Sequence, residues 1–424
     1  MAQRAIARFL RTLKHRWWSF FYGRCLVGFP WFWPARPPGM PAMVAARRIV
    51  RRHFGRDHHS AYRVSAQVFA ALVWPLAVLI SLWEVRRRGP EAVPVKRFPG
   101  AVWAAMRHNV LPGEYFAYAL WKPDRRANID NYLFSKEGPR LFKLLNRPSQ
   151  PNPIDDKLAF HEMCKARLLP SPEILAAFAP AGKLLEFASG EPPKRDLFVK
   201  SRMGLGGDGA ERFRWQGVAF ESNRGCCLSA DALGGYLASR ARMENRTLLV
   251  QPALSNHPAL RCGANACLAP ARLITGLSTD GNVFPICSFI YFTQTDQLPA
   301  WYVSVALIDV TTGRLLSGRQ ELCGQRSSHQ LDSDSDVALP DWETALRHVK
   351  IAHQACPNFV FVGWDVAFTD QGPMLLEGNA NWCADEYQRL REPLGYTKFA
   401  DILATRLREL EAASVPLCHS DQRI

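Results

Sequence analysis

Alternating apolar and polar positions near the C-terminal end of the chain predict an antiparallel β-hairpin over residues 360–382. Two apolar runs, VFVGWDVAF and PMLLEGN, flank the turn sequence Thr369-Asp370-Gln371-Gly372. β-Branched and aromatic residues on both sides of such a turn are typical of two paired strands. The polar side chains inside these apolar runs are therefore the first candidates for functional residues.

The periodicity of residues 154–413 predicts a mixture of helices and strands, and hence an α+β fold class. An amphipathic helix is expected from the Asp155-Asp156 cap to Pro170, and two long strands are expected on either side of Asp280-Gly281. Further helices are expected at 228–247, 342–356 and 396–413, and further strands at 197–200, 211–220, 247–254 and 301–316.

The first 88 residues have a different pattern, which predicts contact with a membrane surface. Residues 1–63 combine Arg-rich segments with clusters of Trp, Phe and Tyr, but they lack the small-residue site of a cleaved signal peptide. Residues 64–83 are uncharged and long enough to span a bilayer as a helix. Basic residues at both ends and Pro75 leave three alternatives: a single span, a re-entrant or in-plane membrane helix, and a helix buried on the soluble body.

The distribution of charge argues against a nucleic-acid-binding protein. The formal net charge is +15, but residues 1–100 hold 18 Lys and Arg against 3 acids, which leaves 35 residues of each sign in the remainder. The main body is therefore neutral. A nucleic-acid-binding arm rarely contains twenty uncharged apolar residues, so the basic region favours a membrane partner.

The 11 cysteines form neither a C-x-x-C pair nor a set with zinc-ligand spacing. Scattered thiols of this kind are typical of small buried side chains in a reducing compartment. No disulfide framework is therefore expected.

Composition divides the chain into four regions. Residues 1–100 are the basic, aromatic region, and residues 101–153 are a small helical subdomain that ends in the linker PSQPNP. Residues 154–413 form the main α+β domain, and residues 414–424 are a polar tail.

Two carboxylates and an amide lie on the predicted hairpin. Asp365 is on its first strand, and Glu377 and Asn379 are two apart on the second, so that their side chains leave one face of the sheet. Buried carboxylates repel one another unless a cation lies between them, and Mg²⁺ with a bound phosphate is a common solution. The alternative is a solvated hairpin edge, which the apolar residues before Glu377 disfavour.

A Gly-rich segment follows a predicted strand that ends at Lys200. Gly204, Gly206 and Gly209 match G-x-G-x-x-G, but the following ERFRWQGVAF alternates like a strand and supplies no helix N-terminus for a pyrophosphate. Strand, Gly-rich loop and strand are instead typical of a flap whose backbone N–H groups cover phosphates. Lys200 would add a positive charge there.

The order of these features resembles the ATP-grasp superfamily. Lys157, Lys200, the Gly-rich flap, the LLVQPAL segment, Arg272 and the acidic hairpin follow one another as in that superfamily, over roughly residues 125–410. The segments PARLITG, GWDVAF and LLEGNANW are similar to its sugar-transfer associated group, which is found near polysaccharide and glycosyltransferase genes.

The resemblance implies an ATP-grasp fold, in which two α+β subdomains clamp ATP, and assigns a role to each matching residue. Arg272 would meet the γ-phosphate or an acyl-phosphate, and with Lys200 it is a candidate catalytic residue. One departure is Gly363, where many ligases of the superfamily place an Arg two residues before the metal-binding Asp. The other assignments are Lys157, Lys200, Gly204, Gly206, Gly207 and Gly209 to phosphates, Val250 and Gln251 to adenine, Asn256 or His257 to ribose, and Asp365, Glu377 and Asn379 to one or two Mg²⁺ (or Mn²⁺).

By resemblance, the function is ATP-dependent ligation of a carboxylate to an amine through an acyl-phosphate. The substrate would be a glycan precursor or a polar metabolite at the cytoplasmic face of the membrane, contacted through residues 1–88. Two alternatives are a phosphotransferase, which stops after moving phosphate, and a membrane-anchored scaffold without catalysis.

Overall fold

The computed structural model describes residues 42–56, 60–88, 94–134, 137–146, 152–204, 207, 209–260, 267–292, 304–321 and 337–413. The basic, aromatic residues 1–41, Gly206, the tail 414–424 and most of the linker lie outside these ranges. The chain divides into two compact units, residues 1–145 with 383–424 and residues 146–382.

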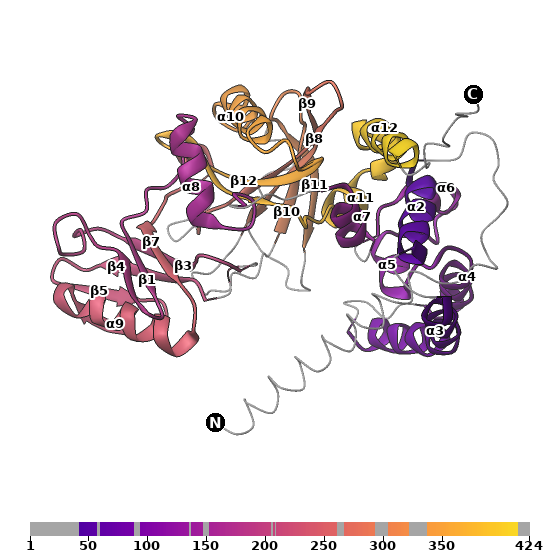
Figure 1. Ribbon diagram of the computed structural model, residues 1–424, viewed down its shortest axis with the longest axis horizontal. Helices are drawn as coiled ribbons and strands as arrows, with labels where there is room; N and C mark the ends of the chain where they lie inside the picture. Colours follow the sequence, from indigo (N-terminus) through magenta and orange to yellow (C-terminus); the bar gives the residue numbers. More distant parts are fainter. Residues whose placement is uncertain are drawn as a thin grey trace, which may run out of the picture. The chain divides into compact units, whose positions relative to one another are not determined.

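Unit 1 is helical throughout its described part (Figure 1). Its elements are α2 (Ala42–Arg56), α3 (Ser60–Arg88), η2 (Val95–Arg97), α4 (Phe98–His108), α5 (Pro112–Ala117), α6 (Pro123–Ala127), η3 (Ile129–Asn131), α7 (Gly138–Leu145), α11 (Asp385–Leu390), η5 (Leu394–Tyr396) and α12 (Lys398–Ala413).

Both ends of the chain contribute to unit 1. The buried Gln388 side chain of α11 donates to the Leu133 carbonyl at 2.7 Å and accepts from the Leu133 N–H at 2.9 Å. Tyr118 donates to the Asp385 carboxylate at 2.5 Å, and α12 packs on α2. The segment after residue 382 therefore belongs with unit 1, whereas the sequence had grouped it with the main domain.

The uncharged segment 64–83 is helical, as predicted, and lies within α3. One face of α3 packs into unit 1, where Trp74 donates from its ring N–H to the Ala105 carbonyl at 3.1 Å. Ser81 accepts from the Gly113 N–H at 3.1 Å. None of the helices in the described ranges is both long and apolar enough to cross a membrane.

Unit 2 contains two antiparallel sheets. Its helical elements are α8 (Lys157–Ala166), α9 (Ala230–Glu244), η4 (Pro258–Leu260) and α10 (Trp342–Gln354). Its strands are β1 (Ala176–Ala179), β2 (Gly182–Leu185), β3 (Leu197–Ser201), β4 (Glu211–Trp215), β5 (Ala219–Ser222), β6 (Cys227–Ser229), β7 (Leu248–Pro252), β8 (Ala271–Leu277), β9 (Val283–Phe292), β10 (Ser304–Ile308), β11 (Leu315–Glu321), β12 (Phe361–Thr369) and β13 (Gly372–Asn379).

Among the described residues, one sheet has the strand order β2-β1-β7-β3-β4-β5-β6 and the other β11-β10-β9-β8-β12-β13. Helix α9 covers the first sheet through Leu233 and Leu237, which pack with Val199, Phe213 and Val250. The expected helices, the hairpin β12–β13 and the pair β8–β9 are confirmed. The run 211–220, expected as one strand, is instead the pair β4–β5, because Gln216 and Gly217 turn the chain.

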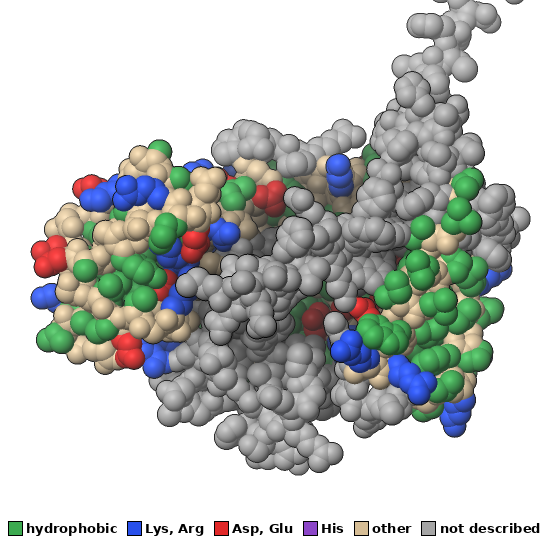
Figure 2. Space-filling view, turned by 90° about the horizontal axis from the view of Figure 1, so that it is seen from below, with side chains coloured by type: hydrophobic (Ala, Val, Ile, Leu, Met, Phe, Trp, Pro, Cys, Tyr) green, Lys and Arg blue, Asp and Glu red, His purple; other side chains and the backbone are tan. Residues whose placement is uncertain are grey.

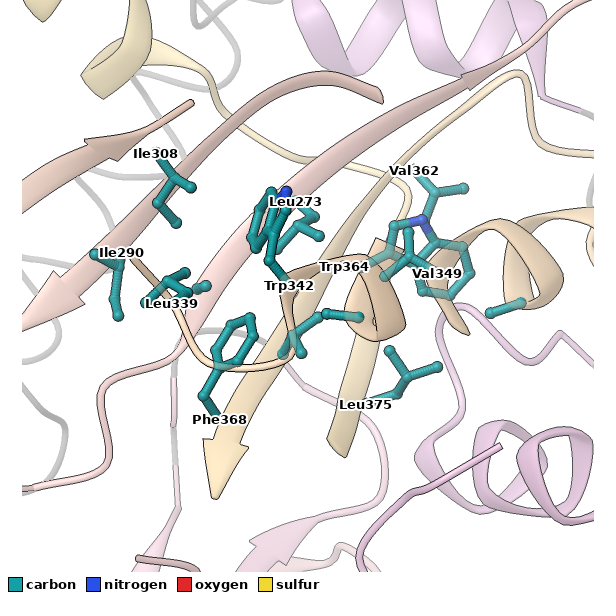
Figure 3. Close-up of a cluster of buried hydrophobic side chains, with 14 of the residues drawn as sticks. Leu273, Ile290, Ile308, Leu339, Trp342, Val349, Val362, Trp364, Phe368 and Leu375 are labelled. Carbon is teal, nitrogen blue, oxygen red and sulfur yellow. The ribbon is translucent and has the colours of Figure 1, made fainter. Parts of the chain in front are cut away.

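The second sheet and α10 enclose the main core (Figure 3). Trp342 of α10 stacks on Phe368 of β12 with ring centroids 6.1 Å apart, and Leu273 of β8 and Leu375 of β13 complete the same layer. Helix α8 joins this core through Phe160. The seven described cysteines are all free thiols.

Candidate active site

The site lies on the face of the second sheet that is turned away from α10. Side chains alternate along β12, so that Val362, Trp364 and Val366 enter the core while Gly363 and Asp365 point the other way. Asp365 lies in register with Arg272 of β8 and with Glu377 of β13. Three neighbouring strands thus carry one transverse row of charged side chains.

A β-bulge brings Glu377 onto this face. Val366 pairs with Leu375, whereas Asp365 pairs with Glu377, so Leu376 is the extra residue on β13. Without the extra residue, Glu377 would share the core-facing side of Leu375, because alternate residues of a strand point the same way. The local irregularity therefore produces the acidic pair.

Within the row, each carboxylate is paired with a cation. Arg272 makes a two-point ion pair with Asp365, with Nη2 3.1 Å from Oδ2. The Asn379 amide donates to the same Oδ2 at 3.3 Å. Lys157 lies with its Nζ 3.2 Å from Oε2 of Glu377. Asp365, Glu377, Asn379, Arg272 and Lys157, which the sequence placed in one site, are thus brought together.

Lys157 is held in place by the start of α8. Asp156 caps the helix by accepting from the N–H of Leu158 at 2.9 Å, and it also receives Arg202, with Nη2 2.5 Å from Oδ2. The Lys157 ammonium then donates to the carbonyl of Gly204 at 2.8 Å. The cap fixes the first turn, so Lys157 joins the acidic hairpin to the first residue of the Gly-rich segment.

Unlike Arg272 and Lys157, Lys200 makes no hydrogen bond or ion pair within the described residues. Burial lowers the pKa of Lys200 to about 8; the charges of Glu377 and Asp365 oppose this shift, and the charge of Lys157 adds to it. A lysine whose ammonium lacks a fixed partner beside an acidic site can accept an anionic group.

The pKa values of the two carboxyl groups of the row are shifted in opposite directions. Burial raises the pKa of Asp365 to about 6, with Glu377 acting in the same direction and Arg272 opposing it. Burial would also raise the pKa of Glu377, but Lys157 and Lys200 outweigh that effect and lower it. Glu377 is therefore the group that is ionised most readily.

An open hollow of about 140 Å³ lies beside this row. Its volume suits a phosphate-sized group rather than a whole nucleotide, for which pockets of several hundred Å³ are usual. The lining residues are Ile154, Asp155, Lys157, Met203, Gly204, Glu377, Gly378 and Asn379.

Gly363 lies in a position where a side chain has no room. A Cβ placed there would lie 2.7 Å from the Cβ of Trp382 and 3.2 Å from the Cδ of Arg272. Trp382 and the Arg272 stem therefore fill the space where the resemblance led us to expect an arginine, and Arg272 is the arginine that the row contains.

The four residues assigned to adenine or ribose make hydrogen bonds with other groups of the chain. Strand β7 is flanked by β1 and β3, and the Val250 carbonyl accepts from the Leu175 N–H at 2.8 Å. The buried Gln251 side chain donates to the Pro172 carbonyl at 3.2 Å. An adenine contact through this backbone would have to come from the residues after β7, where the sheet ends.

The side-chain amide of Asn256 makes hydrogen bonds within the chain. Asn256 donates to the Cys267 carbonyl at 2.7 Å and accepts from the Ala269 N–H at 2.8 Å. The His257 N–H donates to the Phe368 carbonyl at 2.7 Å, and its ring accepts from the Ala259 N–H. Both residues thus make hydrogen bonds within the chain, and their assignment to ribose stays a prediction.

The sequence did not single out the anchor at the far end of the Gly-rich segment. Gly207 and Gly209 have φ angles of +71° and +78°, which favour glycine. Arg240 of α9 contacts the Gly209 carbonyl and donates to the fully buried Glu211 carboxylate at 2.7 Å. Arg240 lies about 30 residues beyond the loop, so no local spacing could have revealed it.

The donor set fits a hard divalent cation such as Mg²⁺. Asp365 and Glu377 face each other across the hairpin and Asn379 lies two residues beyond Glu377, so the hairpin offers two carboxylates and an amide. Oxygen ligands are what Mg²⁺ prefers. In the part of the chain that the structure describes, no cluster of three or more His, Cys, Asp or Glu could hold a metal. A cation here would therefore also need ligands from a bound phosphate.

A family model described as sugar-transfer associated ATP-grasp matches residues 138–390, more than half of the chain. The chain belongs to the sugar-transfer associated ATP-grasp family. The match spans α8, both sheets and the acidic hairpin, and it confirms the family that the sequence motifs resemble. No curated protein matches the chain.

Solved structures that resemble this ATP-grasp chain are distant. An L-amino acid ligase from Bacillus licheniformis is 11% identical, over 67% of this chain and 58% of that chain, with a TM-score of 0.36. An N5-carboxyaminoimidazole synthetase from Staphylococcus aureus in complex with ADP is 7% identical, over 60% and 53%, with a TM-score of 0.34. D-Alanyl-alanine synthetase A from Vibrio cholerae is 11% identical, over 60% and 64%, with a TM-score of 0.33. The chain spans less than two thirds of the length of each.

Proposed function

We propose that this ATP-grasp protein is an ATP- and Mg²⁺-dependent ligase that joins a carboxylate to an amine. The observation that carries the proposal is the transverse row Arg272–Asp365–Glu377–Lys157, which lies beside Gly204 at the start of the Gly-rich segment. Paired acids and cations beside a Gly-rich segment are the elements that phosphoryl transfer from ATP requires.

Lys157 of the row and the neighbouring Lys200 are suited to hold and polarise phosphate oxygens. Lys200 has no fixed partner among the described residues and lies near Lys157, so both ammonium groups would bind the β- and γ-phosphates. Lys157 would exchange its contact with Glu377 for one with phosphate, which frees the Glu377 carboxylate. When bound by Asp365, Glu377 and Asn379, Mg²⁺ would neutralise phosphate charge during transfer.

Arg272 would stabilise the transferred group and the oxyanion of the ligation step. Its guanidinium is fixed by two contacts to Asp365, and it is the arginine next to Gly363. A substrate carboxylate would attack the γ-phosphorus, the bond to ADP would break, and an acyl-phosphate would form. An amine would then displace inorganic phosphate to give an amide. A glycan precursor with a uronic acid or an amino sugar is the substrate class that we favour.

This reaction can be tested by ADP release from pairs of carboxylates and amines. We expect ADP formation that needs Mg²⁺ and one particular carboxylate, and hydroxylamine should trap the acyl-phosphate as a hydroxamate. Arg272→Lys should lower the rate at least tenfold, because a point charge cannot reproduce the two-point contact. ADP release with a hydroxyl acceptor and no hydroxamate would identify a phosphotransferase instead, and no ADP release with any acceptor would favour the scaffold.

A further inference from the structure

Helix α3 presents a continuous apolar stripe to solvent. The exposed residues are spaced by three or four, which places them on one side of a helix. The stripe extends over about 22 Å of helix, from the 1.5 Å rise per residue. Its members are Val68, Leu72, Leu76, Leu79, Ile80 and Trp83, of which Leu72 is 74% exposed and Leu79 is 62% exposed.

The opposite side of α3 packs into the hydrophobic core of unit 1. Trp74, Val78 and Leu82 are buried there with the residues of α4 and α5. A single bilayer span would expose this packed side, with its hydrogen bonds from Trp74 and Gly113, to lipid. The helix can therefore meet a membrane with its stripe alone, which requires the helix axis to lie along the surface.

Positive charge borders the C-terminal end of the stripe. Arg86 and Arg87 are exposed one turn beyond Trp83, and the Arg87 guanidinium lies 5.1 Å from the centre of the Trp83 ring. Figure 2 shows hydrophobic side chains gathered over α3 with Lys and Arg side chains at their edge. An indole beside arginine is typical of the depth of lipid headgroups, where the ring is half buried and the cation meets phosphate.

We infer that the α3 stripe is a docking surface for an anionic membrane. A lipid surface offers both an apolar layer for the leucines and negative charge for Arg86 and Arg87. The charge of residues 1–100, with 18 Lys and Arg against 3 acids, complements the same partner. The helix lies in the plane of the membrane and keeps the protein at its surface.

The inference can be tested by vesicle flotation of the full chain without nucleotide, so that the result does not depend on ATP binding. Vesicles of phosphatidylcholine alone are compared with vesicles that contain 30% phosphatidylglycerol. We expect the wild type to float with the anionic vesicles. The triple variant Leu72→Glu, Leu76→Glu, Leu79→Glu should float at least fivefold less.

A matched control carries three glutamates on exposed apolar residues of unit 2. Leu184, Val218 and Met243 are 55%, 84% and 78% exposed, so their replacement gives the same change of charge away from α3. This control should float like the wild type, and the melting temperatures of both variants should stay close to that of the wild type.

Three results would overturn the inference. The first is equal flotation of the α3 variant and the wild type. The second is a wild type that remains at the bottom of the gradient with both neutral and anionic vesicles. The third is a wild-type dimer in the absence of vesicles that the α3 variant converts to a monomer, because the stripe would then be an interface between copies.

Discussion

At the scale of single residues, Lys200 is the group whose protonation should govern ATP binding. Its pKa lies near 8, because burial disfavours the ammonium form. Phosphate needs the charged form, so affinity should be greatest below pH 8 and should fall as the pH rises through that value. We expect the Kd for ATP to rise about tenfold between pH 7.5 and pH 9.5, measured by calorimetry.

Lys200→Arg provides the control for this pH dependence. Arginine stays protonated throughout this range, so the variant should bind ATP with nearly the same Kd at both pH values. An equally strong pH dependence in Lys200→Arg would show that another group titrates, and Lys200 would then lose its assigned role.

Gly363 should be intolerant of even one added methyl group. In Gly363→Ala the new Cβ would lie 2.7 Å from the Trp382 Cβ, which forces Trp382 and the Arg272 stem to move. Such overpacking usually costs about 1–3 kcal/mol. Urea unfolding should detect this loss, and ADP release should fall as well.

Gly235→Ala is the matched substitution. Gly235 lies in α9, and a Cβ there meets nothing within 4 Å. Alanine is the better helix former, so this variant should be as stable as the wild type or more stable by up to about 1 kcal/mol. Equal stability of both alanine variants and the wild type would contradict the close packing at Gly363.

At the scale of elements, a buried chain of hydrogen bonds ties α10 to the sheet beneath the site. Trp364 donates to the Thr275 hydroxyl at 2.8 Å, that hydroxyl lies 2.7 Å from Nδ1 of His353, and Nε2 of His353 lies 2.9 Å from the Phe359 carbonyl. The contact with a carbonyl requires a proton on Nε2. Burial lowers the pKa of His353 to about 4, so the imidazole is neutral near pH 7 and its Nδ1 accepts from the Thr275 hydroxyl.

The neutral imidazole should make stability depend on pH. Burial lowers the pKa of His353 from 6.5 to about 4. The unfolded chain therefore binds more protons between those values, and stability is lost as the pH falls through them, by roughly 3 kcal/mol at pH 4. We expect the unfolding free energy of the wild type to fall from pH 7.5 to pH 4.5 relative to His353→Gln, which cannot titrate.

The comparison with His353→Gln is needed because Asp365 acts in the opposite direction. Its pKa is raised to about 6, so the folded chain binds more protons than the unfolded chain below that pH, which favours folding. If both proteins lost the same stability between the two pH values, the proposed effect of His353 would be refuted.

The sequence predicted the elements of the site better than their geometry. The hairpin β12–β13, the cap at Asp156 and the pair β8–β9 follow from local patterns of apolar residues, turns and caps. The bulge at Leu376 does not, because it depends on how β13 packs against β12. A simple alternation would have placed Glu377 in the core with Leu375.

At the scale of the whole molecule, the division into units was also beyond local patterns. Residues 396–413 have the amphipathic spacing of an ordinary helix, and nothing in that spacing says which unit the segment after residue 382 joins. Contacts such as that between Gln388 and Leu133 join positions about 250 residues apart. The engaged side chains of Gln251 and Asn256 are likewise visible only in three dimensions.

The central claim is that the acidic hairpin and the lysines form one site for Mg²⁺ and ATP. The most direct test is a thermal-shift titration with ATP, with and without Mg²⁺, on the wild type and on Glu377→Gln, which removes one carboxylate charge at nearly constant volume. The account predicts a rise in melting temperature of several degrees that needs Mg²⁺ and is lost in the variant. A folded wild type without any shift at millimolar ATP and Mg²⁺, or an equal shift in both proteins, would contradict it.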